Sequence, residues 1–331
     1  MWRRVRGILR PDGFHGALFA PPFFEGWYVK LVDRLADERL ALIFGAIDTE
    51  RAGDRHAFLQ VFDGKRGTAA NLRFDRGELS ASESVLDVTL GGAHLTERAV
   101  TLDLARDPGS LRGRIEFGPL HPWPISLRAP GAMGWYAWMP FMECYHGVVS
   151  MDHELRGHLE WAGRRYDFDG GRGYLEKDWG RAFPSSWIWM QSNHFGEPGV
   201  SLMGSLARIP WIGRSFAGFI VGLLYQRKLY RFATYTGAKT ERIHVAGDDA
   251  HWVIYDRRHE LEIRAHRGQT SALAGPTLDG MERTVDETLS GRIEVRLARR
   301  GWRSKVVFEG TGEPAGMEMH GDFTELGAQP S

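Results

Sequence analysis

The chain has 331 residues, which is long enough for a substantial hydrophobic core in two folding units or in one large β-rich unit. Lysine plus arginine and aspartate plus glutamate number 42 each, and this balance gives no argument for a nucleic-acid partner or an acidic membrane surface. Cys144 is the only cysteine, so an intrachain disulfide is excluded. We expect Cys144 to be a small buried residue.

The N-terminal segment, residues 1–16, is basic but has no apolar run after its arginines. It therefore lacks the pattern of a secretory signal, and we expect a cytoplasmic protein. The most apolar run, residues 215–225, is too short to cross a bilayer and is interrupted by Gly218 and Gly222. We interpret this run as a buried strand.

The first firm strand prediction is residues 24–32, directly after the turn at Pro21 and Pro22. Alternation places Glu25 on the same face as Trp27, and Tyr28 on the opposite face. Because burial disfavours the charged form of a carboxyl, we expect a raised pKa for Glu25. The alternative is an ion pair between Glu25 and an arginine elsewhere in the chain.

The sequence then predicts a succession of short strands separated by glycine-rich or acidic turns. In the first half these strands are residues 39–48, 55–63, 85–90, 100–105, 110–117, 143–161 and 164–168. Prolines between residues 119 and 140 predict an irregular crossing segment, which would suit the mouth of a barrel. After residue 195 the predicted strands are residues 200–208, 216–225, 229–235, 251–256, 260–266, 292–297 and 305–309. The polar stretch 267–289 is expected to be a long loop.

This pattern is all-β, with about sixteen strands and no βαβ alternation. One barrel of that size would enclose an open pore, so we expect two smaller units. We place the boundary near residue 168, which gives units of residues 1–168 and 169–331.

The stretch from Gly170 to Phe195, GGRGYLEKDWGRAFPSSWIWMQSNHF, combines charge, glycine and tryptophan more densely than any other part of the chain. Alternation in its first half places Tyr174, Glu176 and Asp178 on one face of a strand, with Lys177 and Trp179 on the other. Two carboxylates therefore share a face with a phenol.

The second half of the stretch alternates again after a turn at residues 183–184, with Trp187, Trp189, Gln191 and Asn193 on one face. Indole rings give broad apolar contact and amides orient a polar group, which suits the wall of a ligand pocket. The alternative is structural, because large aromatics on strands are commonly core residues and the acidic and basic residues at 176–178 could form a surface cluster.

Several chemistries find no support in the sequence. A dinucleotide-binding glycine pattern, a phosphate-binding loop and a Gly-x-Ser-x-Gly elbow are all missing. The histidines, among them His146, His153, His158 and His194, do not follow a known ligand spacing, so we predict no metal site.

The segment YLEKDWGRAFPSSWIWMQSNHF, residues 174–195, together with FFEGWYVKLVD, residues 23–33, resembles the tocopherol cyclase family. Members of that family carry an EGWY block early and an EK(N/D)WG, FP, W-x-W-x-Q-x-N block midway, and both blocks occur here in that order. The likeness extends more loosely over residues 123–147 and 157–168 and thins after about residue 233. Plant members have Asn where this chain has Asp178, which predicts a different substrate if the position binds a quinol hydroxyl.

The resemblance implies two lipocalin-like antiparallel β-barrel or sandwich units in tandem, a fold that holds one apolar ligand in its mouth. It also implies an enzyme that closes a chroman ring on a prenylated hydroquinone. A general acid would protonate the alkene, and the phenol oxygen would capture the cation. No electrons are exchanged in this reaction, so no cofactor is required.

For this chemistry we predict Glu176 as the acid, Glu25 as the second choice, and Asp178 as the group that receives or orients the phenol. A carboxyl in an apolar cavity can stay protonated near neutral pH, and indole faces can stabilise a cation. The predicted substrate-binding residues are Trp27, Tyr28, Tyr174, Lys177, Trp179, Trp187, Trp189, Gln191 and Asn193.

The predicted partner is therefore an apolar isoprenoid or prenylquinol, and acquiring it would suit peripheral contact with a membrane; no protein partner is implied. Two alternatives remain open: a non-catalytic carrier of an isoprenoid or other apolar ligand, and a hydratase of the same architecture that adds water across an alkene.

Overall fold

The structure, a computed structural model, describes residues 2–49, 55–106, 109–302 and 304–328. Antiparallel strands make up most of it, and its helices are α1 (Trp2–Ile8) and short 3₁₀ turns. The chain divides into two compact units, one formed by Met1–Phe183 with Leu273–Thr284 and the other by Pro184–Ala272 with Val285–Ser331. The predicted all-β fold in two antiparallel units is confirmed.

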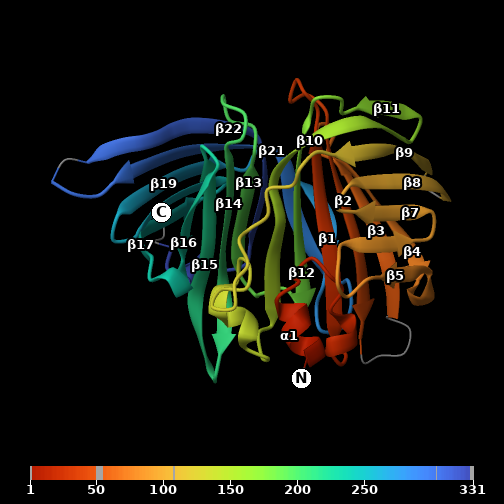
Figure 1. Ribbon diagram of the computed structural model, residues 1–331, viewed down its shortest axis with the longest axis horizontal. Helices are drawn as coiled ribbons and strands as arrows, with labels where there is room; N and C mark the ends of the chain where they lie inside the picture. Colours follow the sequence, from red (N-terminus) through yellow and green to blue (C-terminus); the bar gives the residue numbers. More distant parts are fainter. Residues whose placement is uncertain (1, 50–54, 107–108, 303, 329–331) are drawn as a thin grey trace. The chain divides into compact units, whose positions relative to one another are not determined.

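The first unit contains a twelve-stranded sheet in the order β4-β3-β2-β1-β12-β10-β9-β8-β7-β6-β5, with β11 paired to β10 (Figure 1). Its strands are β1 (Phe23–Val32), β2 (Arg39–Asp48), β3 (Arg55–Asp63), β4 (Thr68–Asp75), β5 (Leu79–Ala81), β6 (Asp87–Leu90), β7 (Ala93–Thr96), β8 (Ala99–Arg106), β9 (Gly109–Phe117), β10 (Cys144–Trp161), β11 (Arg164–Asp167) and β12 (Arg172–Gly180). In Figure 1, β7, β8 and β9 run at a steep angle to β1, β2 and β3.

One apolar core fills this unit, and all twelve strands contribute side chains to it. Strand β4 shows how the sequence produces this arrangement, because Ala70, Leu72 and Phe74 alternate with exposed residues and point into the core. Leu72 of β4 and Leu79 of β5, at opposite ends of the strand order, lie in the same cluster. The sheet therefore curls around its core.

The second unit is built on a sheet in the order β16-β15-β14-β13-β22-β21-β19-β18-β17. Its strands are β13 (Trp187–Ser192), β14 (Ser201–Trp211), β15 (Arg214–Tyr225), β16 (Lys228–Ala233), β17 (Lys239–Ala246), β18 (Asp249–Tyr255), β19 (His259–His266), β21 (Arg283–Arg299) and β22 (Lys305–His320), and β20 (Ser271–Gly275) is the remaining strand of the chain. Each of the nine strands in this order contributes to a second apolar core. The run predicted as a buried strand at residues 215–225 is part of β15.

The division between the units differs from the predicted boundary at residue 168. Strand β12, the first half of the stretch 170–195, pairs with β1 on one side and β10 on the other, so it belongs to the first unit. Only the second half of that stretch, from Pro184 onward, lies in the second unit. The crossing segment between β9 and β10 is irregular, as predicted, with a short 3₁₀ turn at Gly134–Trp138.

The predicted long loop at residues 267–289 is wrong, because it contains β20 and the first part of β21. Of the polar residues in this stretch, Thr284 and Asp286 occupy exposed positions of β21, whereas Glu287 and Thr288 are buried. None of the helices that the structure describes has the length and apolar character needed to span a membrane.

Candidate functional site

The candidate site lies on three neighbouring strands of the first unit, β1, β12 and β10. In their antiparallel register, Glu176 of β12 lies opposite Tyr28 of β1 and Val148 of β10, and Asp178 lies opposite Gly26 and His146. Residues directly opposite one another on paired strands place their side chains on the same face. One face of the sheet therefore carries Glu176 and Asp178 together with a histidine that the register supplies from β10.

Tyr174, Glu176, His146 and Asp178 form what we call the acid cluster. The Tyr174 hydroxyl donates a hydrogen bond of 2.5 Å to Glu176 Oε2, and His146 Nε2 lies 3.4 Å from the same oxygen. The other nitrogen of this imidazole, Nδ1, is 2.9 Å from Asp178 Oδ1. The imidazole thus stands between two carboxyl groups, each within reach of one ring nitrogen.

The cluster is shielded from solvent to different degrees. The Glu176 side chain is 5% exposed, the His146 side chain 11% and the Asp178 side chain 27%. Burial raises the pKa of the Tyr174 phenol well above its ordinary value, and the negative charge of Glu176 adds to this rise. Tyr174 therefore keeps its proton at neutral pH and acts as a permanent donor to Glu176. Access to solvent increases from Glu176 towards Asp178.

Two further groups accompany the acid cluster. The buried residue Lys30 lies opposite Tyr174 in the register of β1 and β12, so a lysine shares this face. Cys144, which we expected to be a small buried residue, is partly buried with its Sγ 4.0 Å from Asp178 Oδ1. Burial raises the pKa of the Cys144 thiol, which therefore stays protonated.

The opposite face of the same strands carries a buried ion pair between Glu25 of β1 and Lys177 of β12. Both side chains are 0% exposed. The backbone N–H of His15 donates to both Glu25 oxygens at 2.9 Å, and Lys177 Nζ also contacts the carbonyl oxygen of Gly13 and His15 Nδ1. His15 Nε2 is 3.1 Å from the carbonyl oxygen of Gly7, an arrangement that protonates Nε2 and leaves Nδ1 to accept from Lys177.

The expectation of a raised pKa for Glu25 is wrong. Burial alone would raise the pKa of this carboxyl, but the Lys177 ammonium holds it below its ordinary value. Burial also lowers the pKa of Lys177, an effect that Glu25 opposes, and burial next to Lys177 lowers the pKa of His15. Glu25 therefore has a lysine partner, where the sequence had suggested an arginine, and it is an ionised carboxylate.

Indole rings enclose this ion pair. Lys177 Nζ lies 4.9 Å from the ring centre of Trp27 and 5.0 Å from that of Trp179, which are cation–π distances. The Trp27 indole N–H donates to the carbonyl oxygen of Asp12 at 3.1 Å, and the His15 ring stacks on Trp179 at 4.2 Å. Trp27, Trp179 and Lys177, all predicted substrate contacts, thus lie on the face opposite Glu176, whereas Tyr28 and Tyr174 share its face.

The remaining predicted substrate contacts lie on or next to β13 in the second unit. The Trp187 indole N–H donates to Glu318 at 2.7 Å, and its ring stacks on His320 at 4.4 Å. Trp189 and Gln191 are buried on the same strand, and the Asn193 side-chain oxygen lies 3.1 Å from His194 Nδ1.

Comparison with known proteins adds a second line of evidence. A model of the family described as "Tocopherol cyclase-like" matches residues 93–321, more than half of the chain. The chain belongs to the tocopherol cyclase-like family. The protein of Oryza sativa subsp. japonica named "Probable tocopherol cyclase, chloroplastic" is 26% identical over 96% of this chain and 80% of its own length. "Tocopherol cyclase, chloroplastic" of Zea mays is 26% identical over 61% of this chain and 45% of its own length.

Among solved structures, CghA bound to Sch210972 has a similar fold. It aligns with a TM-score of 0.55 and 12% sequence identity, over 91% of this tocopherol cyclase-like chain and 89% of the CghA chain. At that identity the likeness concerns the fold alone.

The acid cluster of this tocopherol cyclase-like protein also brings together possible metal ligands. His146, Glu176 and Asp178 each offer one ligand atom, and these atoms lie within 4.8 Å of one another. One imidazole nitrogen and two carboxylate oxygens are a donor set that transition metals accept. Among the residues that the structure describes, this is the set of three His, Cys, Asp or Glu side chains whose ligand atoms converge in this way.

Sequence reasoning identified the carboxylates and the phenol of the acid cluster but missed His146, and it also missed His15 beside Glu25 and Lys177. His146 was one of many scattered histidines, and only the register of β10 with β12 places it between Glu176 and Asp178. His15 precedes the first predicted strand, in a segment interpreted as a lead-in. The one signal in the sequence was alternation in ECYHG, residues 143–147, which places Cys144 and His146 on one face.

Proposed function

We propose that this tocopherol cyclase-like protein is an enzyme that protonates an alkene of an apolar, prenylated hydroquinone and closes a chroman ring without redox change. The observation that carries the proposal is the buried Glu176 carboxyl, whose Oε2 accepts a hydrogen bond from the Tyr174 hydroxyl and lies 3.4 Å from His146 Nε2. Membership of the family supports the substrate class, because the rice and maize relatives are named as tocopherol cyclases.

In this proposal Glu176 is the general acid. Its proton adds to the less substituted carbon of a trisubstituted alkene, and a tertiary cation forms at the other carbon. The phenol oxygen bonds to that cation and loses its proton, so the product has the mass of the substrate. Water must be kept from the cation, which agrees with the low exposure of Glu176.

The phenol proton has a short route back to the acid. Asp178 is the more exposed carboxylate of the cluster and would accept it. His146 Nδ1 lies 2.9 Å from Asp178 and His146 Nε2 lies 3.4 Å from Glu176, so a single imidazole can carry the proton from one carboxylate to the other. Each turnover would then return one proton to Glu176 and leave the imidazole in its other tautomer.

Glu25 is not the acid in this proposal, because its ion pair with Lys177 keeps it ionised. Tyr28, which lies opposite Glu176, stays a proposed substrate contact. Trp187, Trp189, Gln191 and Asn193, which belong to the second unit, stay predictions from the sequence.

The test is incubation of the purified protein with a geranylgeranylated hydroquinone and analysis of the products by mass spectrometry. The proposal expects a cyclised product of unchanged mass, and a Glu176→Gln variant slower by roughly 10²–10⁴-fold, the usual contribution of a general acid. Glu160→Gln, at an exposed position of β10, is the matched control and should keep the wild-type rate. A Glu176→Gln variant that cyclises as fast as the wild type would remove Glu176 from the mechanism.

The same incubation separates the alternatives. A product heavier by one water would assign a hydratase. Quenching of tryptophan fluorescence without any product would assign a carrier of apolar ligands.

A further inference from the structure

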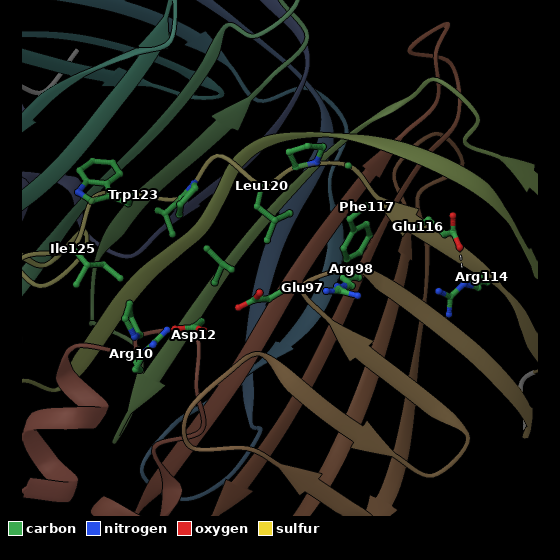
Figure 2. Close-up of a pocket in the computed structure, with 16 residues that line it drawn as sticks. Arg10, Asp12, Glu97, Arg98, Arg114, Glu116, Phe117, Leu120, Trp123 and Ile125 are labelled. Carbon is green, nitrogen blue, oxygen red and sulfur yellow. Dashed lines mark hydrogen bonds and ion pairs between the residues drawn. The ribbon is translucent and has the colours of Figure 1, made fainter.

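The first unit contains a hollow that is lined by a different set of residues from the acid cluster. It is a cavity of about 780 Å³ between the N-terminal segment at Arg10, the turn before β8 at Glu97 and Arg98, the end of β9, and the segment 118–125 (Figure 2). None of the acid-cluster residues lines it. Its volume lies in the range of sites that enclose one drug-sized molecule.

The cavity exists because β9 and β10 separate. They pair from Phe117 opposite Leu155 to Leu111 opposite Trp161, and before Leu155 the partner of β10 is the crossing segment. There the Trp123 backbone N–H donates to the Val148 carbonyl oxygen at 3.4 Å, and the Met151 N–H donates to the His121 carbonyl oxygen at 2.8 Å. Pro119 and Pro122 lack a backbone N–H, so this segment cannot continue the sheet as a regular strand.

The wall along the crossing segment and β10 is apolar. Figure 2 shows Leu120, Trp123 and Ile125 as lining residues along the crossing segment, and Val148 and Val149 line the cavity from β10. Ile125 is 44% exposed although it is a large aliphatic residue. Exposed aliphatic groups in a concave wall are a favourable surface for the apolar part of a ligand.

The rim of the cavity is charged, with both signs in equal number. It contains three arginines and three carboxylates: Arg10, Arg98, Arg114, Asp12, Glu97 and Glu116. Arg114 and Glu116 form an ion pair at 3.3 Å. Among the described residues, the side chains of Glu97 and Arg98 form no ion pair, whereas the charge of Asp12 also acts on the buried Lys177.

A balanced rim selects against a charged head group. An anionic head group would be attracted by the arginines and repelled by the carboxylates of the same rim. A cationic head group would be attracted by the carboxylates and repelled by the arginines. A hydroxyl group both donates and accepts hydrogen bonds, so it can bind a carboxylate and a guanidinium together without adding net charge. The rim therefore matches a neutral, hydroxylated head.

We propose that this cavity binds a neutral amphiphile, with its apolar chain on the wall at Leu120, Ile125 and Val148 and its hydroxylated head at the rim of Arg98 and Glu97. Val148 lies opposite Glu176 in the register of β10 and β12, but no acid-cluster residue lines the cavity, so binding here does not require the proposed cyclisation. A protein that fails to cyclise a prenylquinol can still bind an amphiphile here, and the two results are measured independently.

The test uses three probes that share a decyl chain and differ in head charge: 1-O-decylglycerol, decyl phosphate and decylamine. Binding of each to the full chain is measured by isothermal titration calorimetry at low salt, below the critical micelle concentration. The proposal expects saturable 1:1 binding of 1-O-decylglycerol, roughly tenfold tighter than that of either charged probe. Absence of saturable binding, or tighter binding of either charged probe, would overturn it.

Two matched pairs of variants locate the site. Ile125→Asp should weaken binding of 1-O-decylglycerol by roughly tenfold or more, because it places a charge in the apolar wall. Leu127→Asp, at a 70% exposed position of the same segment that does not line the cavity, should leave binding unchanged. Equal effects of the two substitutions, or no effect of Ile125→Asp, would place the bound probe elsewhere and refute the proposal.

The second pair tests the charge argument. Arg98→Glu makes the rim net negative, so it should weaken 1-O-decylglycerol and strengthen decylamine, which reverses their order or removes the difference. Arg112→Glu, on β9 but outside the cavity, should change neither. An unchanged order of affinities in Arg98→Glu would contradict the assigned role of the rim.

Discussion

Replacement of Lys177 by methionine tests whether the buried ion pair of the first unit stabilises the fold as its geometry indicates. The substitution keeps much of the side-chain volume between Trp27 and Trp179 but leaves the Glu25 carboxylate without its cation. Removing one partner of a buried ion pair costs about 3–5 kcal/mol, because the remaining charge is buried without compensation. For a unit of this size, that loss lowers the melting temperature by roughly 6–20 °C.

The free energy of unfolding is measured by urea denaturation followed by circular dichroism, at pH 7 and at lower pH. Because the pKa of Glu25 is lower in the folded protein than its ordinary value of 4.5, the ionised carboxylate stabilises the wild type above that pH. This stabilisation is lost as the pH falls through the folded pKa. The difference between the wild type and Lys177→Met should therefore be largest near pH 7. It should shrink as the pH falls, because burial raises the pKa of the unpaired Glu25 in the variant and that carboxyl takes up a proton first.

The double variant Lys177→Met, Glu25→Gln supplies the control. It contains no buried charge at this position, so it should recover most of the loss and be more stable than Lys177→Met alone. Two results would refute the reasoning: a Lys177→Met protein within about 1 kcal/mol of the wild type at pH 7, or a double variant whose loss equals the sum of the single losses.

Three further predictions follow from buried groups near the site. Burial lowers the pKa of His153 from 6.5 to about 3. Between these pH values the unfolded chain binds a proton at His153 and the folded protein does not, so the free energy of unfolding falls as the pH drops from 6.5 towards 3. The loss in free energy of unfolding is about 2 kcal/mol at pH 5, and urea denaturation of His153→Gln should show a loss smaller by that amount. If the acid cluster works by proton transfer, prolonged treatment with a chelator should leave turnover unchanged, whereas loss of activity that a divalent cation restores would assign His146, Glu176 and Asp178 as metal ligands. Gly180 has φ +152°, and a Cβ at this position would lie 2.3 Å from the Glu143 carbonyl oxygen. Gly180→Ala should therefore lower the free energy of unfolding in urea by at least about 1–3 kcal/mol, and an unchanged urea midpoint would contradict the close approach.

The relation between sequence and structure is clearest at the strands that carry the site. Alternation in residues 24–32 and 174–179 correctly predicts which side chains share a face, and it correctly separates Lys177 from Glu176. The same alternation does not say which strands are neighbours. β12 lies between β1 and β10, and that order unites Glu176 with His146 and Glu25 with Lys177.

The errors in the fold prediction have a similar origin. The boundary at residue 168 assumed that one continuous stretch of sequence belongs to one unit, whereas β12 completes the first sheet and β13 begins the second. Half of the residues of β4 are polar, and the strand becomes recognisable only once its neighbours bury its apolar face. Strands of this kind are missed along the sequence, so the predicted number of about sixteen strands was too low.

The sequence by itself determined that this chain is all-β, that a phenol and two carboxylates share a strand face, and that its motifs match the tocopherol cyclase-like family. Period-two alternation and local turn residues are properties of neighbouring positions, so they can be read along the chain. Only the tertiary structure decided that Glu25 is ionised, that His146 joins the two carboxylates, and that β9 and β10 part to leave a cavity with a balanced rim. These features depend on strand order and register, which arise from contacts between distant segments, and on burial, which sets the protonation of each group.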